Sequence, residues 1–145
     1  MASTRLTLRG VRCRAVEVPM SYVLGTSAAA VRAAPLLLVD VQTEEGVTGR
    51  TYLFCYTRAA AAPIRSMIED AASALQGAAL DPTAWWAVLY KRYTLIGVQG
   101  IVRMAMAALD TACWDALAIA ANVPLATLIG AAPKKIPAYN SCGLG

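Results

Sequence analysis

The sequence contains no histidine. Without that side chain, the 145 residues cannot form a His–Asp dyad, a Ser–His–Asp triad, a Cys–His pair or a histidine-ligated metal site by themselves. Enzyme classes that need one of these groups within this stretch of chain are therefore excluded.

Cysteine is scarce and widely spaced. The residues are Cys13, Cys55, Cys113 and Cys142, and no two of them form a C-x-x-C metal or redox motif. The chain is rich in alanine rather than in loop-forming residues, which argues against a disulfide scaffold. We expect four buried thiols in a reducing cytoplasm.

Long basic runs are also missing. The net charge is +4, but the 13 lysines and arginines are scattered and never occur more than two in a row. A nucleic-acid surface would gather basic residues on one face, with aromatic residues among them. We therefore expect no nucleic-acid partner.

No apolar run is long and clean enough for a membrane span. The charge-free stretch at residues 116–133 contains Asn122, Pro124 and Gly130, and the helical stretch before it carries Asp110. The amino-terminal ten residues lack the continuous apolar segment of a signal peptide. These features favour a soluble, cytoplasmic domain without a membrane partner.

The composition as a whole predicts one folded domain. Hydrophobic residues make up 58% and charged residues 15%, which is enough to bury a core and too apolar for disorder. Alanine supplies much of the apolar fraction, and alanine favours helix. We therefore expect more helix than strand.

The first third of the chain predicts strands. Residues 6–18 alternate between apolar and basic, with one slip of phase near Gly10 that suggests a bulge. Residues 35–41 and 51–56 form two further strand patterns. The short turn at residues 42–49 joins them as an antiparallel hairpin.

Residues 20–34, between the first two strands, show no periodicity. The stretch is small and uncharged except for Arg32. A loop of this length inside a compact domain is usually functional or disordered. We interpret it as a mobile lid.

The remainder predicts helices. Apolar residues at helical spacing over 64–75 follow Thr57, a plausible N-cap, and Pro63 marks either the start of this helix or a kink in it. Asp81 and Pro82 have the residue types of an N-cap and first helical position.

A third helix is expected over residues 98–121, apolar almost all round and therefore central, and it should end at Asn122 and Pro124. A short helix at 125–129 follows. Three strands and then helices predict an α+β fold: a three-stranded antiparallel sheet and a bundle of three to four helices.

The central helix carries a recognisable motif. DTACWD at residues 110–115, followed by PLATLIG at 124–130, resembles the signature of the mandelate racemase and muconate lactonizing enzyme family of the enolase superfamily. YLFCYT at 52–57, IVRM at 101–104 and VDV at 39–41 are similar to the mandelate racemase group in particular. The resemblance covers essentially the whole chain.

The resemblance implies an enolase N-terminal-domain-like capping domain at residues 1–133. Such a domain closes over a (β/α) barrel, whose active site lies at the carboxyl ends of its strands. Residues 134–145 would then begin a truncated barrel, with Ile136 to Ser141 resembling its first strand. The family's chemistry is proton abstraction α to a carboxylate, with Mg²⁺ stabilising the enediolate, in racemases, cycloisomerases and acid-sugar dehydratases.

The family's catalytic groups do not occur in this chain. Its Lys-x-Lys base, its three carboxylate ligands and its His–Asp dyad would all lie beyond the last residue, and the adjacent Lys134 and Lys135 do not match the motif. We therefore expect no catalytic residue, no metal ligand and no racemase activity in this chain alone. The complete enzyme would bind Mg²⁺ and a small carboxylate substrate and would form a homo-oligomer.

By the same resemblance, some residues match the pocket around the substrate's non-reacting end, and one matches a serine near the substrate carboxylate. The pocket residues are Leu24, Thr26, Val31, Phe54 and Tyr56, and the serine is Ser141. A closing lid would exclude water there.

Asp110 and Asp115 lie five positions apart, about 140° around a helix, and cannot face one ion. We expect them to have structural partners, Arg103 among them. Trp85, Trp86 and Trp114 would then be core or domain-interface residues.

Two other functions fit the residues. The chain could be a non-catalytic interaction module that kept the capping fold, or a small membrane-associated protein. Aggregation relieved by a co-expressed barrel would support the capping domain, monodisperse behaviour of the chain alone would support the interaction module, and partition into detergent would support the membrane-associated protein.

Overall fold

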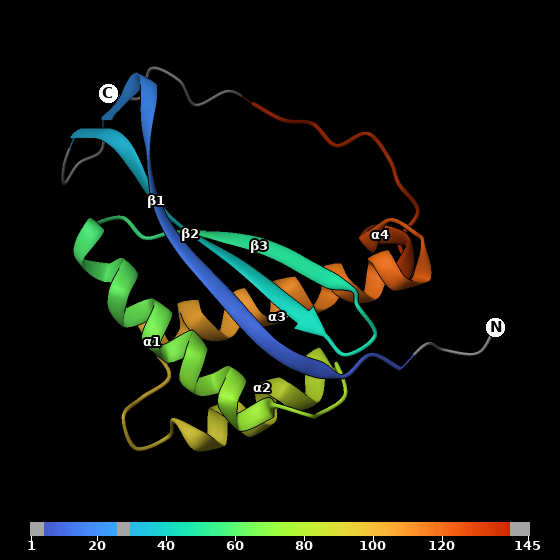
Figure 1. Cartoon of the computed structure of the whole chain (residues 1–145). Helices are drawn as coiled ribbons and strands as arrows, with labels where there is room; N and C mark the ends of the chain where they lie inside the picture. The colour runs from blue at the N-terminus through green and yellow to red at the C-terminus, as the bar shows by residue number, and fades with distance from the viewer. Residues whose placement is uncertain (1–4, 26–29, 140–145) are drawn as a thin grey trace.

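The computed structural model describes residues 5–25 and 30–139. The described residues confirm the α+β fold: a three-stranded antiparallel sheet in the order β1-β2-β3, followed by four helices (Figure 1). The strands are β1 (Leu8–Gly25), β2 (Ala30–Thr43) and β3 (Thr48–Phe54). The register of β1 shifts between Leu8 and Gly10, where the sequence predicts a bulge.

The two faces of the sheet differ because successive side chains of a strand point to opposite faces. On one face, Leu37, Val39 and Val41 of β2 have no solvent-exposed surface and pack in the core. Leu36, Leu38 and Asp40 alternate with them on the opposite face, where Leu38 is 38% exposed. Helices therefore cover one face of the sheet, and the other is open.

The β1–β2 hairpin continues past the end of β3 as a two-stranded arm, defined here as residues 18–25 and 30–34. Leu24 pairs with Val31 there, after an irregularity in register that follows Pro19. The prediction of a loop over residues 20–34 is wrong for the described part of this range, which forms strand. The small uncharged residues of the arm show no alternation that would predict a strand. They form strand because the arm's two segments pair with each other.

The helices begin close to where their capping residues predict. α1 (Arg58–Leu75) follows Thr57 at the N-cap and contains Pro63 well inside it, so the helix does not start at that proline. In α2 (Pro82–Arg92) the Asp81 carboxylate accepts the N–H of Ala84 at 2.9 Å, as an N-cap side chain does.

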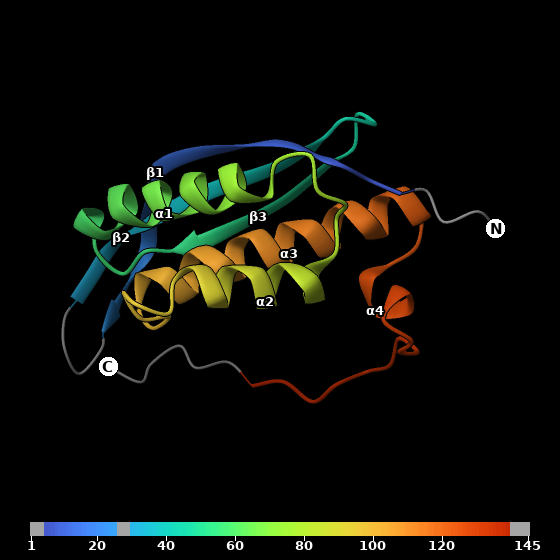
Figure 2. The ribbon, with the colours of Figure 1, turned by 90° about the horizontal axis from the view of Figure 1, so that it is seen from below.

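α3 (Ile101–Ala121) ends at Asn122, which has left-handed φ, and α4 (Leu125–Leu128) follows. α1 and α3 lie against the sheet, and α2 packs on α3 from the far side (Figure 2). Contrary to the expectation from the sequence, α3 is by length and composition apolar enough to cross a membrane, but its buried residues, Ala105 and Leu109 among them, belong to the core of the domain.

Gly49 allows β3 to approach α3 closely. A Cβ on Gly49 would lie 1.9 Å from the carbonyl oxygen of Ala112 and 2.6 Å from the nitrogen of Ala116. Both atoms are helix backbone and cannot move aside as a side chain would. Glycine is therefore required at this contact.

Residues 131–139 form neither helix nor strand and are exposed. They lead away from α4 and pass outside the helical layer (Figure 2). The strand expected over 136–141 is not formed in its described part, because no described strand lies beside it to supply hydrogen bonds.

Candidate functional site

Two aromatic residues mark the end of β3. The rings of Phe54 and Tyr56 meet edge to face, with centroids 5.0 Å apart and planes at 89°. Tyr56 has φ of 61° and its side chain is 76% exposed. A non-glycine residue in the left-handed region is uncommon, and strained residues of this kind cluster at functional sites.

The backbone on both sides of Tyr56 is fixed. The Cys55 N–H donates to the Pro35 carbonyl at 2.8 Å, and the Thr57 N–H donates to the Cys55 carbonyl at 2.7 Å. Cys55 is buried, and α1 begins at Arg58. The chain therefore turns sharply from strand to helix and holds the Tyr56 ring out toward solvent.

The expected pocket residues fall into two groups. Leu24 and Val31 form a pair in register on the arm, where Leu24 is 46% exposed. Phe54 pairs in register with Leu36, and Val31 lies five residues before Leu36, about 16 Å of extended strand. The structure thus separates Leu24 and Val31 from Phe54 and Tyr56, while Thr26 and Ser141 lie outside the described residues.

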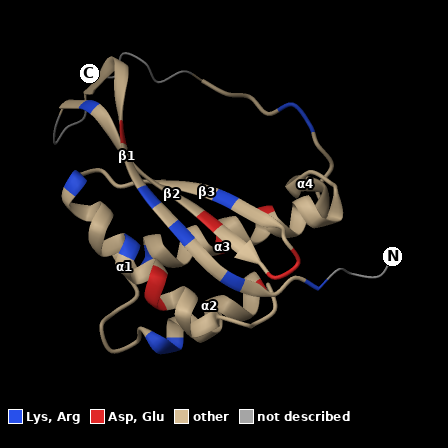
Figure 3. Ribbon diagram, in the orientation of Figure 1, with Lys and Arg blue, Asp and Glu red and all other residues tan. Residues whose placement is uncertain are grey.

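The open face of the sheet carries charge as well as apolar side chains. Arg12, Asp40 and Arg50 form a row across the three strands, with Arg12 Nη2 at 2.7 Å and Arg50 Nε at 3.8 Å from the Asp40 carboxylate. Arg14, Leu38 and Tyr52 form the next row toward the arm. Figure 3 shows the basic residues spaced along β1 and β3, with one acidic position between them.

The acidic residues of α3 have structural partners. The indole N–H of Trp86 donates to Asp110 at 2.9 Å, and the backbone N–H of Arg50 donates to Asp115 at 2.8 Å. Arg103 does not pair with Asp110 as expected: its Nε donates to the Val98 carbonyl at 3.2 Å. Its guanidinium instead lies over the Trp86 ring, 5.7 Å from the centroid.

Magnesium prefers several oxygen ligands, mostly carboxylates, converging on one point. Within residues 5–25 and 30–139, no three acidic or cysteine side chains come together in a group that could hold a metal ion. The described part of this chain therefore does not fit a magnesium site, and any such ion must depend on other residues.

The described thiols are not poised to react. Burial, with a smaller effect of Glu69, raises the pKa of Cys13 to about 11. Burial, with a smaller effect of Asp110, raises the pKa of Cys113 to about 12. Cys55 and Cys113 are buried as expected, whereas Cys13 is only partly buried.

An ion-pair network missed in the sequence joins α1 to α2. Arg92 donates to both carboxylate oxygens of Asp70, from Nε at 2.9 Å and Nη2 at 2.8 Å, and the Tyr93 hydroxyl donates to the same carboxylate at 2.7 Å. The adjacent Arg92 and Tyr93 follow Asp70 by more than 20 positions, and no local pattern connects them.

Comparison with known proteins gives consistent results. The sequence pattern of the mandelate racemase / muconate lactonizing enzyme N-terminal domain matches residues 8–130. A Bradyrhizobium enolase, solved with magnesium and mandelic acid, is 41% identical with a TM-score of 0.89 over 96% of this chain and 38% of its own. An enolase from the alpha-proteobacterium BAL199, solved with magnesium, is 36% identical with a TM-score of 0.81, over 86% of this chain and 34% of its own.

Among curated proteins, the 3,6-anhydro-alpha-L-galactonate cycloisomerase of Streptomyces coelicolor is 28% identical over 110 residues, which is 72% of this chain and 29% of that protein. The chain thus spans about a third of the length of these relatives.

Proposed function

Because the chain belongs to the mandelate racemase / muconate lactonizing enzyme family as its N-terminal domain, we propose that it caps the active site of a complete enzyme. That enzyme would be magnesium-dependent and would abstract the proton α to the carboxylate of a small acid, as a racemase, cycloisomerase or acid-sugar dehydratase. The observation that carries the proposal is the likeness of nearly the whole chain to the Bradyrhizobium enolase that binds magnesium and mandelic acid.

The geometry at the end of β3 supports a role in substrate closure. Phe54 and Tyr56 present an edge-to-face aromatic pair, and Tyr56 keeps a strained backbone while its ring remains exposed. Such strain persists where the surrounding structure holds it, often at a ligand contact. In the proposal this pair contacts the apolar end of the substrate, and Leu24 and Val31 on the arm approach from the other side.

Closure of the arm over the active site would exclude water from the carboxylate substrate. Exclusion of water strengthens the electrostatic interactions of the reacting carboxylate. Bound magnesium would supply charge stabilisation for the deprotonated acid. The residues of this chain would act by contact and by enclosure, because its described part does not fit a magnesium site.

Exposed apolar residues at the end of α3 and along α4 support docking of a second domain. Ile119 is 50% exposed, Leu125 39% and Ile129 60%. Ile136, in the following extended segment, is 76% exposed. We propose that a barrel packs here, with residues 134–145 leading into it, and that the complete enzyme is a cytoplasmic homo-oligomer.

A chimera tests the proposal. This chain would replace the matching N-terminal residues of the Bradyrhizobium enolase, and exchange of the α-proton of mandelate would be followed by NMR in D₂O. We expect exchange by the chimera and none by this chain alone or by the barrel without a cap. Exchange by the isolated chain, or a folded chimera as inactive as the uncapped barrel, would contradict the proposal.

The chain and the barrel, expressed as separate proteins, address the alternative of a non-catalytic interaction module. Such a module would bind the separately expressed barrel without restoring exchange. Size-exclusion chromatography of the two purified parts, run beside the exchange assay, separates the two functions.

A further inference from the structure

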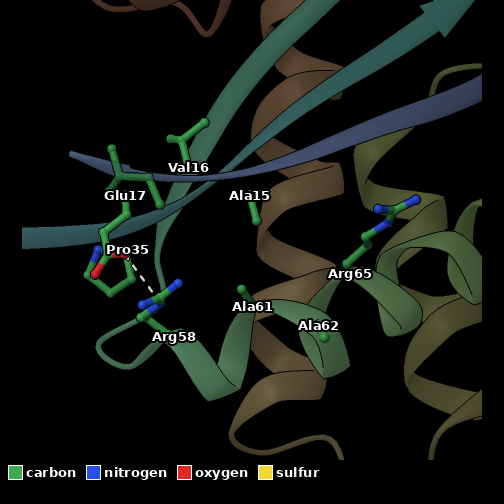
Figure 4. A pocket seen from close by; sticks show the side chains of 9 residues that line it. Ala15, Val16, Glu17, Pro35, Arg58, Ala61, Ala62 and Arg65 are labelled. Atoms are coloured by element: carbon green, nitrogen blue, oxygen red, sulfur yellow. Dashed lines mark ion pairs between the residues drawn. The ribbon is translucent and has the colours of Figure 1, made fainter.

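A cavity lies between the sheet and α1 (Figure 4). Its volume is about 350 Å³, within the range of small-molecule sites. Ala15 pairs in register with the buried Leu37, so it faces the helices, whereas Phe54 pairs with Leu36 on the open face. Leu36, the partner of Phe54, also lines the cavity, but the space itself lies between Ala15 and α1, on the helix side of the sheet.

Small side chains create the space. Ala15 points from β1 toward Ala61 and Ala62 on α1, and nothing larger fills the gap between them (Figure 4). A well-packed domain leaves few voids larger than a water molecule between its layers. An opening of this size at a helix–sheet boundary can accept an apolar group of several carbon atoms.

Two arginines stand at the ends of the cavity. Arg58 and Arg65 lie seven residues apart on α1, about 10 Å along the helix, and both line the opening. Arg58 contacts Glu17 through Nε at 3.2 Å, and Arg65 contacts Glu69 through Nε at 2.7 Å. Among the described residues, the terminal Nη atoms of both guanidinium groups make no hydrogen bond, so they can still donate to an anion.

From this arrangement we infer that the cavity binds a small amphiphilic carboxylate, with its apolar body against Ala15, Ala61 and Ala62 and its carboxylate on Arg58 or Arg65. Arginine matches a carboxylate through paired N–H donors, and the two arginines outnumber Glu17, the one carboxylate in the lining, which favours an anionic over a neutral or cationic head group. The inference does not depend on the proposed capping function, because the cavity and its lining belong to this chain alone.

The test uses the 145-residue chain and octanoate as the probe, followed by two-dimensional NMR of the backbone amides. We expect saturable shifts confined to the amides of residues 15–17, 36, 58–62, 64 and 65, since Pro35 and Pro63 have no amide proton. A ligand of about ten non-hydrogen atoms should bind with a dissociation constant on the order of millimolar. Octylammonium, with the same chain and the opposite charge, should bind at least about tenfold more weakly.

Two variants and one control locate the site. Ala62→Phe places a ring in the cavity and should abolish the shifts, whereas Ala74→Phe, at an exposed position of the same helix, should leave them unchanged. The double variant R58Q/R65Q removes both guanidinium charges while leaving polar side chains, and it should weaken octanoate binding at least about fivefold.

Circular dichroism checks that each variant folds. The inference is overturned by the absence of saturable shifts in the folded parent chain, by equal binding of octylammonium, or by unchanged binding in a folded R58Q/R65Q variant.

Discussion

The carboxylate of Asp115 accepts the backbone N–H of Arg50 at 2.8 Å, across 65 positions of sequence. This hydrogen bond joins the second half of α3 to β3 beside Gly49, where the helix backbone and the strand approach closely. The hydrogen bond is exposed although Asp115 is half-buried, and its charged acceptor makes it stronger than a bond between neutral groups.

Removal of that acceptor should therefore destabilise the domain. We expect Asp115→Ala to lower the free energy of unfolding by about 1–2 kcal/mol, and Asp115→Asn, which keeps a neutral acceptor, by less. Urea denaturation measures both values. Thr111→Ala, at an exposed position one turn earlier on α3, is the matched control, and an equal loss in that variant would contradict the role of the hydrogen bond.

Gly49→Ala should be far more damaging. The added Cβ would meet helix backbone at 1.9 Å, so the sheet and α3 must separate, at an expected cost above about 3 kcal/mol. Gly10→Ala is the control, because a Cβ there meets no atom within 4 Å. Thermal unfolding of the two variants should differ clearly, and similar melting temperatures would show that α3 can shift without penalty.

Asp70 should make the stability of the domain depend on pH in acidic solution. Hydrogen bonds from Arg92 and then from Tyr93 lower the pKa of Asp70 from 3.8 to about 2. A carboxylate with a lowered pKa in the folded state contributes its stability above pH 4 and loses it as the pH falls toward 2.

The Asp70 side chain is 45% exposed, so screening reduces this contribution to about 1 kcal/mol. Asp70→Asn should thus be less stable than the parent chain at pH 6, and the difference should shrink between pH 4 and pH 2. Urea denaturation over that range measures it. A difference that stays constant with pH would rule out the ionised carboxylate as its source.

Tyr56 should be more important for substrate capture than for folding. In Tyr56→Gly, the loss of left-handed strain offsets the greater freedom of the unfolded chain, so the free energy of unfolding should change by less than about 1 kcal/mol. In the chimera, the same variant should raise KM for mandelate more than Tyr56→Phe does. A large loss of stability in Tyr56→Gly would instead assign the ring a structural role.

The described thiols should resist alkylation. In a Cys142→Ser background, iodoacetamide at pH 8 should react slowly with the folded chain, because the raised pKa values of Cys13 and Cys113, about 11 and about 12, leave little thiolate. Unfolding in guanidinium chloride should make all three remaining cysteines react rapidly. Mass spectrometry after timed quenching reports which thiol is labelled, and rapid labelling of Cys113 in the folded chain would contradict its burial.

Local signals in the sequence predicted most of the helical boundaries. Thr57, Asp81 and Asn122 occupy the capping positions that their residue types suggest, and the glycine-containing turn joins β2 to β3. These features depend on hydrogen bonds within a few residues of each other, so a single sequence contains them.

Features that depend on distant partners were not predictable in the same way. Most of the arm at residues 18–25 and 30–34 has no local period, and only the pairing of its two halves makes it strand. Arg103 was expected to pair with Asp110 because both lie on one helix face, but Trp86 of α2 takes the Asp110 carboxylate instead. Of the candidate site, the exposure of Tyr56 and its positive φ became visible only in three dimensions.

The strand order β1-β2-β3 follows the order of the chain, and each strand pairs only with its sequence neighbour in the described sheet. Contacts between neighbouring segments close short loops, and such contacts form quickly because little chain entropy is lost. The strands can therefore pair in the order in which they leave the ribosome. When α3 has been synthesised, the sheet on which it packs can already be formed.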